Sequence, residues 1–294
     1  MTMLTKVNEP KQTTKSTIRN AMTIDVEDYF QVSAFAPHIS RESWPSLPCR
    51  VERNIDCILS LLNAADVKAT FFTLGWLAER YPEMVKRIVS EGHELASHGY
   101  GHQRASDQSK AEFHDDVSRS KSLLENIGGQ AVLGYRAPSF SIGTNNLWAL
   151  DVLLEAGYKY SSSIYPIKHD HYGMPDAPRF SFYPNGNDGL LELPITTVRF
   201  MERNFPAGGG GYFRLFPYQL SRWLLNRVNR QDKQSGIFYF HPWEVDPEQP
   251  RQQNIGMKTR FRHYVNLART ENRLKALTRD FQWDRMDRIF LVNK

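Results

Sequence analysis

Residues 93–102 read HELASHGYGH and combine a short apolar run with two histidines, His98 and His102, four positions apart. Two glycines between the histidines disfavour a helix, so the pattern predicts a strand that ends near residue 98 and a loop that carries both imidazoles. Imidazole is a common ligand of zinc and similar ions, and a catalytic site usually adds a carboxylate and an open position for water. The chain should therefore supply an acid nearby. Two hydrogen-bonded loop histidines are the alternative interpretation.

Such acids follow the first apolar run of the chain, where residues 20–30 read NAMTIDVEDYF. A carboxylate at the end of a buried strand costs free energy unless it is paired, hydrogen-bonded or bound to a metal. Side chains alternate along an extended chain, which puts Asp25 and Glu27 on the same side. One of them could hold a metal while the other takes a proton from water. Capping of the next helix is the alternative role for these acids and Asp28.

The composition is that of a globular protein: 294 residues, 40% of them hydrophobic, with a net charge of +5. This length can form one large α/β domain or two smaller ones. Basic residues are interspersed with acids, which disfavours nucleic acid binding. Cys49 and Cys57 have neither disulfide nor metal-site spacing and suit a reducing compartment. Residues 1–20 lack an apolar signal core, and no apolar run is long enough to span a membrane. We therefore expect a disordered arm at 1–20, no transmembrane segment and a cytoplasmic location.

Strand and helix patterns alternate along the first half of the chain. Helical periodicity covers 50–65, 77–90, 110–126 and 145–156, and strand-like runs lie at 20–30, 68–73, 93–98, 131–136 and 158–164. This alternation predicts parallel βα units with a site at the carboxyl ends of the strands.

The second half is less regular. We expect short strands at 180–183 and 190–194, a helix at 217–229, a buried strand at 236–244 and a basic amphipathic helix at 257–281. Four glycines at 208–211 indicate either a hinge or a close backbone approach to a ligand.

Two more polar residues stand at predicted strand ends. Arg136 is either a surface cation or a guanidinium that holds a catalytic carboxylate in place. His241 follows a continuous apolar run and precedes Trp243, so it is either a satisfied core histidine or a site residue.

Taken in chain order, the acid pair, the HxxxH pair, Arg-x-Pro and the late strand-end histidine resemble the polysaccharide deacetylase family, the NodB-homology carbohydrate esterases. The resemblance runs from about Ile24 to Trp243. Residues 25–30 (DVEDYF), 212–214 (YFR) and 259–262 (TRFR) resemble the branch associated with exopolysaccharide and exosortase (PEP-CTERM) gene clusters. The family implies an α/β fold, a deformed (β/α) barrel, which we assign to residues 21–250, with a C-terminal helical extension at 251–294 packed on it.

The resemblance also implies roles for individual residues. His98 and His102 would bind a divalent metal, usually zinc, and the catalytic residues would be Asp25 as general base, His241 as general acid and Arg136, which orients Asp25. The family commonly has two adjacent aspartates where this chain reads DVED at 25–28. We expect Glu27 to be the third ligand, with Asp28 as the substitute.

Substrate contacts are expected from a backbone N–H near Ser139 and from aromatic side chains that could stack on sugars: Tyr100, Tyr212 and Trp243, with Trp44 and Trp76 as further candidates. Many relatives have an aspartate where this chain has Ser161. Either the charge network is thinner here, or Glu192 or Glu244 takes that place.

The implied activity is hydrolysis of N-acetyl groups on an N-acetylhexosamine-containing glycan, or on a lipid-linked glycan precursor, in exopolysaccharide biosynthesis. A cyclic amide or imide hydrolase on the same barrel and a non-catalytic glycan-binding or assembly protein are the alternatives. The sequence does not indicate the oligomeric state.

Overall fold

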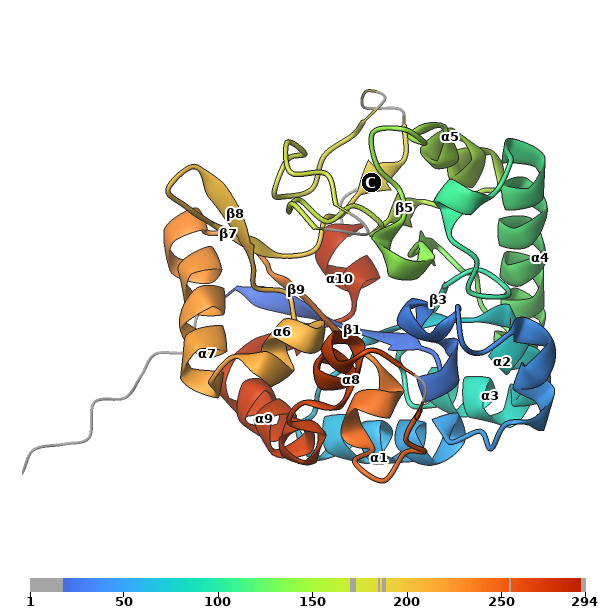
Figure 1. The fold of residues 1–294 in the computed structure, drawn as a ribbon. Helices are drawn as coiled ribbons and strands as arrows, with labels where there is room; N and C mark the ends of the chain where they lie inside the picture. Colours follow the sequence, from blue (N-terminus) through green and yellow to red (C-terminus); the bar gives the residue numbers. More distant parts are fainter. Residues whose placement is uncertain (1–17, 170–172, 185, 187–188, 254, 292–294) are drawn as a thin grey trace, which may run out of the picture.

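The computed structural model describes residues 18–169, 173–184, 186, 189–253 and 255–291. Residues 1–17 of the predicted N-terminal arm lie outside these ranges. A curled sheet occupies the centre of the molecule and helices surround it (Figure 1). In the described part of the chain, no helix combines the length and apolarity needed to cross a bilayer.

The main sheet contains eight strands from the described residues, and its hydrogen-bonded neighbours are parallel. The strands run in the order β10-β1-β2-β3-β4-β5-β6, and β9, which lies off this path, also pairs with β1. Their bounds are β1 Arg19–Val26, β2 Thr70–Thr73, β3 Glu94–Ser97, β4 Gly134–Tyr135, β5 Tyr160–Ser161, β6 Leu191–Glu192, β9 Ile237–Phe240 and β10 Gln282–Asp284. This curled parallel sheet confirms the predicted barrel-like α/β fold.

The helices pack their apolar faces on the sheet, as in α1, where Val51, Ile55, Ile58 and Leu62 are buried at helical spacing. Their bounds are α1 Val51–Ala64, α2 Gly75–Arg80, α3 Pro82–Ser90, α4 Lys110–Gly128, α5 Trp148–Glu155, α6 Gly210–Leu215, α7 Tyr218–Arg227, α8 Met257–Tyr264, α9 Leu267–Asp280 and α10 Met286–Phe290. Ser109 and Glu112 form a capping box at the start of α4.

Two helices expected to be continuous are each divided in two. The segment 77–90 forms α2 and α3, because Pro82 starts a new helix after Tyr81. The segment 257–281 forms α8 and α9, separated at Asn266, whose φ of 55° is left-handed and interrupts the helix.

Several strands also differ from the prediction. The runs at 131–136 and 158–164 contribute only the two-residue strands β4 and β5. Residues 180–183 form a single bridge, Phe182 to Glu192, instead of a strand. An antiparallel hairpin of β7 (Thr197–Phe200) and β8 (Arg203–Pro206) was not predicted. It projects beside α7 in Figure 1.

The segment after residue 250 does more than pack on the barrel. Its strand β10 pairs in parallel with β1, from Arg19 with Gln282 to Ala21 with Asp284. The sheet is therefore completed by the end of the chain, beyond the boundary predicted at 250.

The glycine run at 208–211 makes a close backbone approach, but to the protein's own strand β9. Gly209 has a φ of 110° and bridges Tyr239. A Cβ at Gly209 would lie 2.1 Å from the carbonyl oxygen of Tyr239, so this contact requires a glycine.

Candidate metal centre and active site

Three candidate ligands gather at the carboxyl ends of β1 and β3. Glu27 follows β1, and His98 and His102 lie in the loop after β3. One ligand atom from each lies within 4.8 Å of the others, and all three residues are buried. Glu27 Oε2 is 2.7 Å from His102 Nε2. We refer to these residues as the Glu27–His98–His102 cluster.

The loop holding the two histidines is irregular, as the glycines predicted. Gly99 and His102 have φ angles of 76° and 52°. Asp116 of α4 accepts hydrogen bonds from the backbone N–H of Tyr100. A Cβ at Gly99 would lie 2.8 Å from the same carboxylate. Asp116 thus anchors the loop, a role that the sequence did not reveal because the residue lies within the next helix, α4, and not in the loop itself.

The orientation of His98 suits metal binding. Its Nδ1 lies 2.7 Å from the backbone carbonyl oxygen of Arg136. A carbonyl can only accept, so Nδ1 carries the proton and Nε2 keeps a lone pair for an ion. Burial lowers the pKa of His98 to about 4, which keeps the ring neutral, as a metal ligand must be.

Glu27 has one carboxylate oxygen committed and one available. Its Oε1 accepts from Trp243 Nε1 at 3.2 Å. Its Oε2 is buried and accepts no well-aligned hydrogen bond from any described residue. Burial raises the pKa of Glu27, but His102 and His241 outweigh it and hold the pKa well below the ordinary value. A charged oxygen that faces two imidazoles without a hydrogen bond fits a bound divalent cation.

Asp28, the substitute ligand, lies apart from this cluster. Its Oδ1 accepts from the Tyr29 backbone N–H, and its Oδ2 accepts from the N–H groups of Arg50 at 2.5 Å and Val51 at 2.9 Å. Both oxygens therefore serve the start of α1 and the adjacent turn. Glu27 is the acid that the structure places with the histidines.

Asp25 and Arg136 form a buried ion pair beside the cluster. Arg136 Nη1 donates to Asp25 Oδ1 at 2.6 Å and to Thr23 Oγ1 at 2.8 Å. The other side of the guanidinium donates to the backbone oxygen and hydroxyl of Ser162, and its carbon Cζ lies 4.0 Å from the ring centroid of Phe72. Arg136 is fully buried, which excludes the surface-cation interpretation.

His241 approaches the cluster from β9. Its Nε2 lies 3.4 Å from Glu27 Oε1, and its Nδ1 lies 2.7 Å from Glu244 Oε1. Burial lowers the pKa of His241, but Glu27 and Glu244 outweigh this and raise it to about 9. Glu244 also accepts from the buried Arg214 at 2.5 Å. Burial raises the pKa of Glu244, whereas Arg214 and His241 lower it to about 2.

The Ser161 hydroxyl makes no hydrogen bond to Arg136 or His241 in the described part of the chain. Its hydroxyl donates to Ser163 Oγ, and Glu192 accepts from the backbone N–H groups of Ser163 and Ile164. Glu192 and Glu244 were the two acids considered as replacements for the family aspartate at position 161. Glu244 contacts His241, whereas Glu192 supports the turn after β5.

The predicted sugar-contacting residues have different positions. Ser139 has a left-handed φ of 57°, and its Oγ lies 2.6 Å from Ser33 Oγ. Tyr100 donates to Glu79, and Arg119 lies over its ring. Tyr212 lines a separate small hollow near α7.

The stacking role predicted for Trp243 is wrong. Its ring is stacked on His241 and His263 with centroid distances of 5.1 and 4.2 Å, and 4% of the residue is exposed. Trp243 instead hydrogen-bonds Glu27 and holds it in place.

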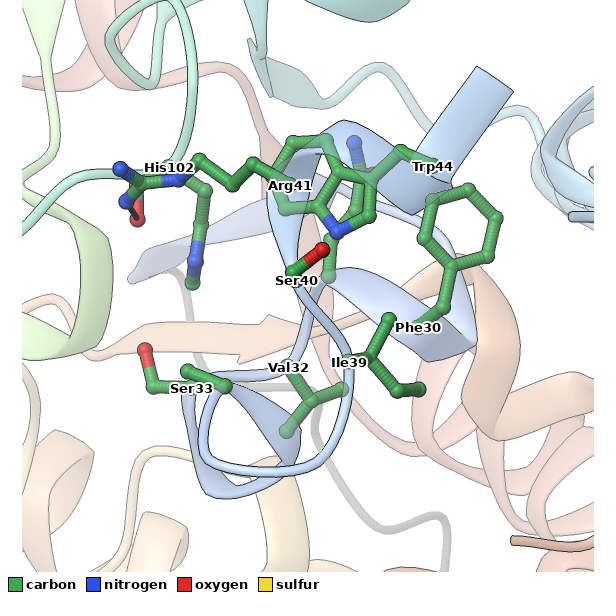
Figure 2. Close-up of a pocket in the computed structure, with 10 residues that line it drawn as sticks. Phe30, Val32, Ser33, Ile39, Ser40, Arg41, Trp44 and His102 are labelled. Carbon is green, nitrogen blue, oxygen red and sulfur yellow. Dashed lines mark hydrogen bonds between the residues drawn. The ribbon is translucent and has the colours of Figure 1, made fainter. Parts of the chain in front are cut away.

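A cavity of about 270 Å³ adjoins the cluster and shares His102 with it. Figure 2 shows Trp44, Phe30, Ser40 and Arg41 around this cavity. Trp76 packs against Trp44 at a ring distance of 5.5 Å.

The fold and site together define a curled parallel β/α barrel with a two-histidine, one-carboxylate cluster at its strand ends. Residues 46–161 match the family model described as polysaccharide deacetylase, and residues 162–291 match a domain of unknown function, DUF3473. Residues 46–161 are therefore similar to polysaccharide deacetylases. A candidate polysaccharide deacetylase from Mycobacterium smegmatis has a similar fold: TM-score 0.58 and 19% identity over 98% of this chain and 93% of that one.

Curated relatives match a shorter part of the chain. A peptidoglycan-N-acetylglucosamine deacetylase of Bacillus cereus is 37% identical over 32% of this chain and 34% of its own length. A peptidoglycan deacetylase of Helicobacter pylori is 35% identical over 38% of each. A chitooligosaccharide deacetylase of Bradyrhizobium is 33% identical over 33% of this chain and 42% of its own length. The matches thus span less than half of each relative.

Proposed function

We propose that the protein is a metal-dependent hydrolase that removes N-acetyl groups from an N-acetylhexosamine unit of a glycan. The observation that carries this proposal is the available Oε2 of Glu27, which faces His98 and His102. Two potential proton-transfer groups flank it: Asp25, which is bound to Arg136, the residue whose backbone oxygen accepts from His98, and His241, at 3.4 Å from Glu27.

The donor set of two imidazoles and one carboxylate is typical of catalytic zinc, so we assign Zn²⁺ to Glu27, His98 and His102. Once bound, the ion supplies a Lewis acid that polarises the amide carbonyl and lowers the pKa of water towards ~7.

The chain's own residues handle the protons. Arg136 holds Asp25 Oδ1 at 2.6 Å, which leaves Oδ2 to accept the proton of the attacking water as general base. Glu244 binds Nδ1 of His241, so that Nε2 of His241 faces the cluster. From there, Nε2 donates a proton to the departing amine. One water and one acetamide thereby give acetate and a free amino sugar. The left-handed turn at Ser139 presents a backbone N–H for the oxyanion.

The names of the relatives support the substrate class, since they refer to N-acetylglucosamine in peptidoglycan and to chitooligosaccharides. The DVEDYF motif at 25–30 leads us to propose the more specific substrate, an exopolysaccharide or its lipid-linked precursor. A lipid-linked precursor is the substrate we expect for a cytoplasmic enzyme.

Acetate release from N-acetylglucosamine oligomers tests this function in wild type and Asp25→Asn. The asparagine keeps an acceptor for Arg136 but cannot take the proton, so we expect a loss of about 10²–10⁴-fold with metal still bound. Asp66→Asn, the same change at an exposed position, should retain full activity. Equal rates in wild type and Asp25→Asn would refute the assignment. Glycan and metal binding without acetate release in wild type would favour a non-catalytic glycan-binding protein.

A further inference from the structure

The cavity beside His102 is a feature of this chain's N-terminal segment. Apart from His102, its described lining residues lie between 30 and 44, ahead of the residues that match the polysaccharide deacetylase model. One wall carries His102 of the cluster. Another carries Ser33, whose hydroxyl lies 2.6 Å from that of Ser139. A ligand in this cavity would therefore adjoin the candidate reaction centre.

Two buried donors on the cavity wall have no partner among the described residues: Trp44 Nε1 and Gln31 Nε2. Trp44 is 5% exposed and Gln31 2%. The orientation of the Gln31 amide follows from its Oε1, which accepts from the Asp28 backbone N–H at 2.8 Å. In Figure 2 the indole nitrogen of Trp44 points into the cavity toward Ser40. Buried donors are costly to leave unpaired, so these two N–H groups indicate a ligand rich in acceptor oxygens.

The charge of the lining indicates an anion. Arg41 lies at the cavity edge and uses one nitrogen, Nη2, to donate to the His102 carbonyl at 3.2 Å. None of the ten described lining residues is acidic. A guanidinium with remaining N–H groups, in a lining without acidic residues, suits a carboxylate, which it can bind through two hydrogen bonds.

The rest of the wall is apolar and includes Phe30, Val32 and Ile39. A sugar ring combines an apolar C–H face with hydroxyl oxygens, which matches this lining. The volume of about 270 Å³ lies just below the usual range for small-ligand pockets, about 300–1,000 Å³, and is suited to one sugar unit.

We propose that this cavity binds an acidic sugar, a hexuronate, next to the N-acetylated sugar of the same glycan. Arg41 binds its carboxylate, Trp44 and Gln31 donate to its oxygens, and the apolar wall contacts its ring. This inference rests on the proposed deacetylase function and narrows its substrate to glycans that contain uronic acids.

Calorimetry on metal-loaded Asp25→Asn protein tests the site without turnover. The two probes are tetrasaccharides of equal length, one of N-acetylglucosamine alone and one that alternates N-acetylglucosamine with glucuronate. We expect the acidic probe to bind about ten-fold more tightly. This preference corresponds to the lower end of the free energy that a hydrogen bond to a charged group contributes, because Arg41 is exposed to solvent. Adding Arg41→Gln should abolish this preference. Arg53→Gln, the same change at an exposed site on α1, should preserve it.

Trp44→Phe provides a second test that leaves the Arg41–His102 contact intact. Loss of one neutral donor should weaken the binding of both probes about two- to ten-fold, with the metal content of each variant unchanged. Equal binding of the two probes, or no effect of Arg41→Gln and Trp44→Phe, would overturn the cavity assignment even if acetate is released. An Arg41-dependent preference without acetate release from either probe by wild type would overturn the deacetylase function and leave the cavity assignment standing.

Discussion

Glu244 connects His241 to a buried arginine: its Oε1 lies 2.7 Å from His241 Nδ1, and its Oε2 accepts from Arg214 Nε at 2.5 Å. Arg214 also donates to the backbone oxygens of His263 and Val265, around the junction of α8 and α9. The orientation of His241 therefore depends on the C-terminal segment, which contributes no ligand to the Glu27–His98–His102 cluster among the described residues.

Glu244→Gln should lower kcat about 10–100-fold, the usual cost of changing a residue that orients a site histidine, with little change in KM. A glutamine has only one acceptor oxygen. If that oxygen accepts from His241, the NH₂ group faces Arg214, and two donors then point at each other, so the orientation of His241 is weakened. Steady-state kinetics on N-acetylglucosamine oligomers measures the effect, and Glu248→Gln at an exposed position is the control. An unchanged kcat in Glu244→Gln would show that His241 is oriented by other contacts.

Arg136→Met should reduce the free energy of unfolding by about 3–5 kcal/mol, because it leaves the carboxylate of Asp25 buried without its partner. Urea denaturation measures this loss. Adding Asp25→Leu removes the unpaired charge and should recover much of the stability, but no activity. If the double variant is as unstable as Arg136→Met, the loss comes from packing against Phe72 and not from the ion pair.

Glu94 should make stability depend on pH. Burial, with a contribution from Asp287, raises the pKa of this carboxyl from 4.5 to about 7, so the folded state favours the protonated form. Its contribution to stability is fully present below pH 4.5 and is lost as the pH rises through 7. Relative to Glu94→Gln, wild type should lose about 2–3 kcal/mol of unfolding free energy between pH 4.5 and 8. Urea melts across this range measure it, with Glu155→Gln at an exposed site as control. Parallel pH profiles for wild type and Glu94→Gln would contradict the assignment.

Gly209→Ala should destabilise the fold by at least about 1–3 kcal/mol, because its left-handed φ is strained for alanine and the added Cβ would meet the Tyr239 carbonyl. Gly256→Ala is the matched control, since a Cβ there meets nothing within 4 Å. Thermal unfolding compares the two variants. Equal Tm values would mean that the contact between residue 209 and β9 does not require glycine.

The sequence predicted the parts of the site that depend on local periodicity. The glycines correctly placed His98 and His102 on a loop, and Glu27 lies with them, as expected. The predicted alternation does not extend to Glu27, because β1 ends at Val26 and the Glu27 N–H bonds the Asp25 carbonyl at 3.0 Å. Parallel strands then bring their carboxyl ends to one edge, which explains why Arg136 and His241 lie nearby.

What the sequence could not predict depends on contacts between distant segments. Asp28 accepts hydrogen bonds from the backbone N–H groups of residues 50 and 51. The ring of Trp243 is stacked on His263 of α8. Neither partner has a local signal. Strand β10 was missed for the same reason, because its pairing with β1 joins opposite ends of the chain.

The most direct test of the central claim measures metal content and acetate release together, on wild type and His98→Ala, with an N-acetylglucosamine oligomer as substrate. The account predicts one divalent ion per chain in wild type, and loss of both the ion and acetate release in His98→Ala. A folded wild-type protein that binds no divalent ion, or a His98→Ala variant that retains both properties, would contradict it.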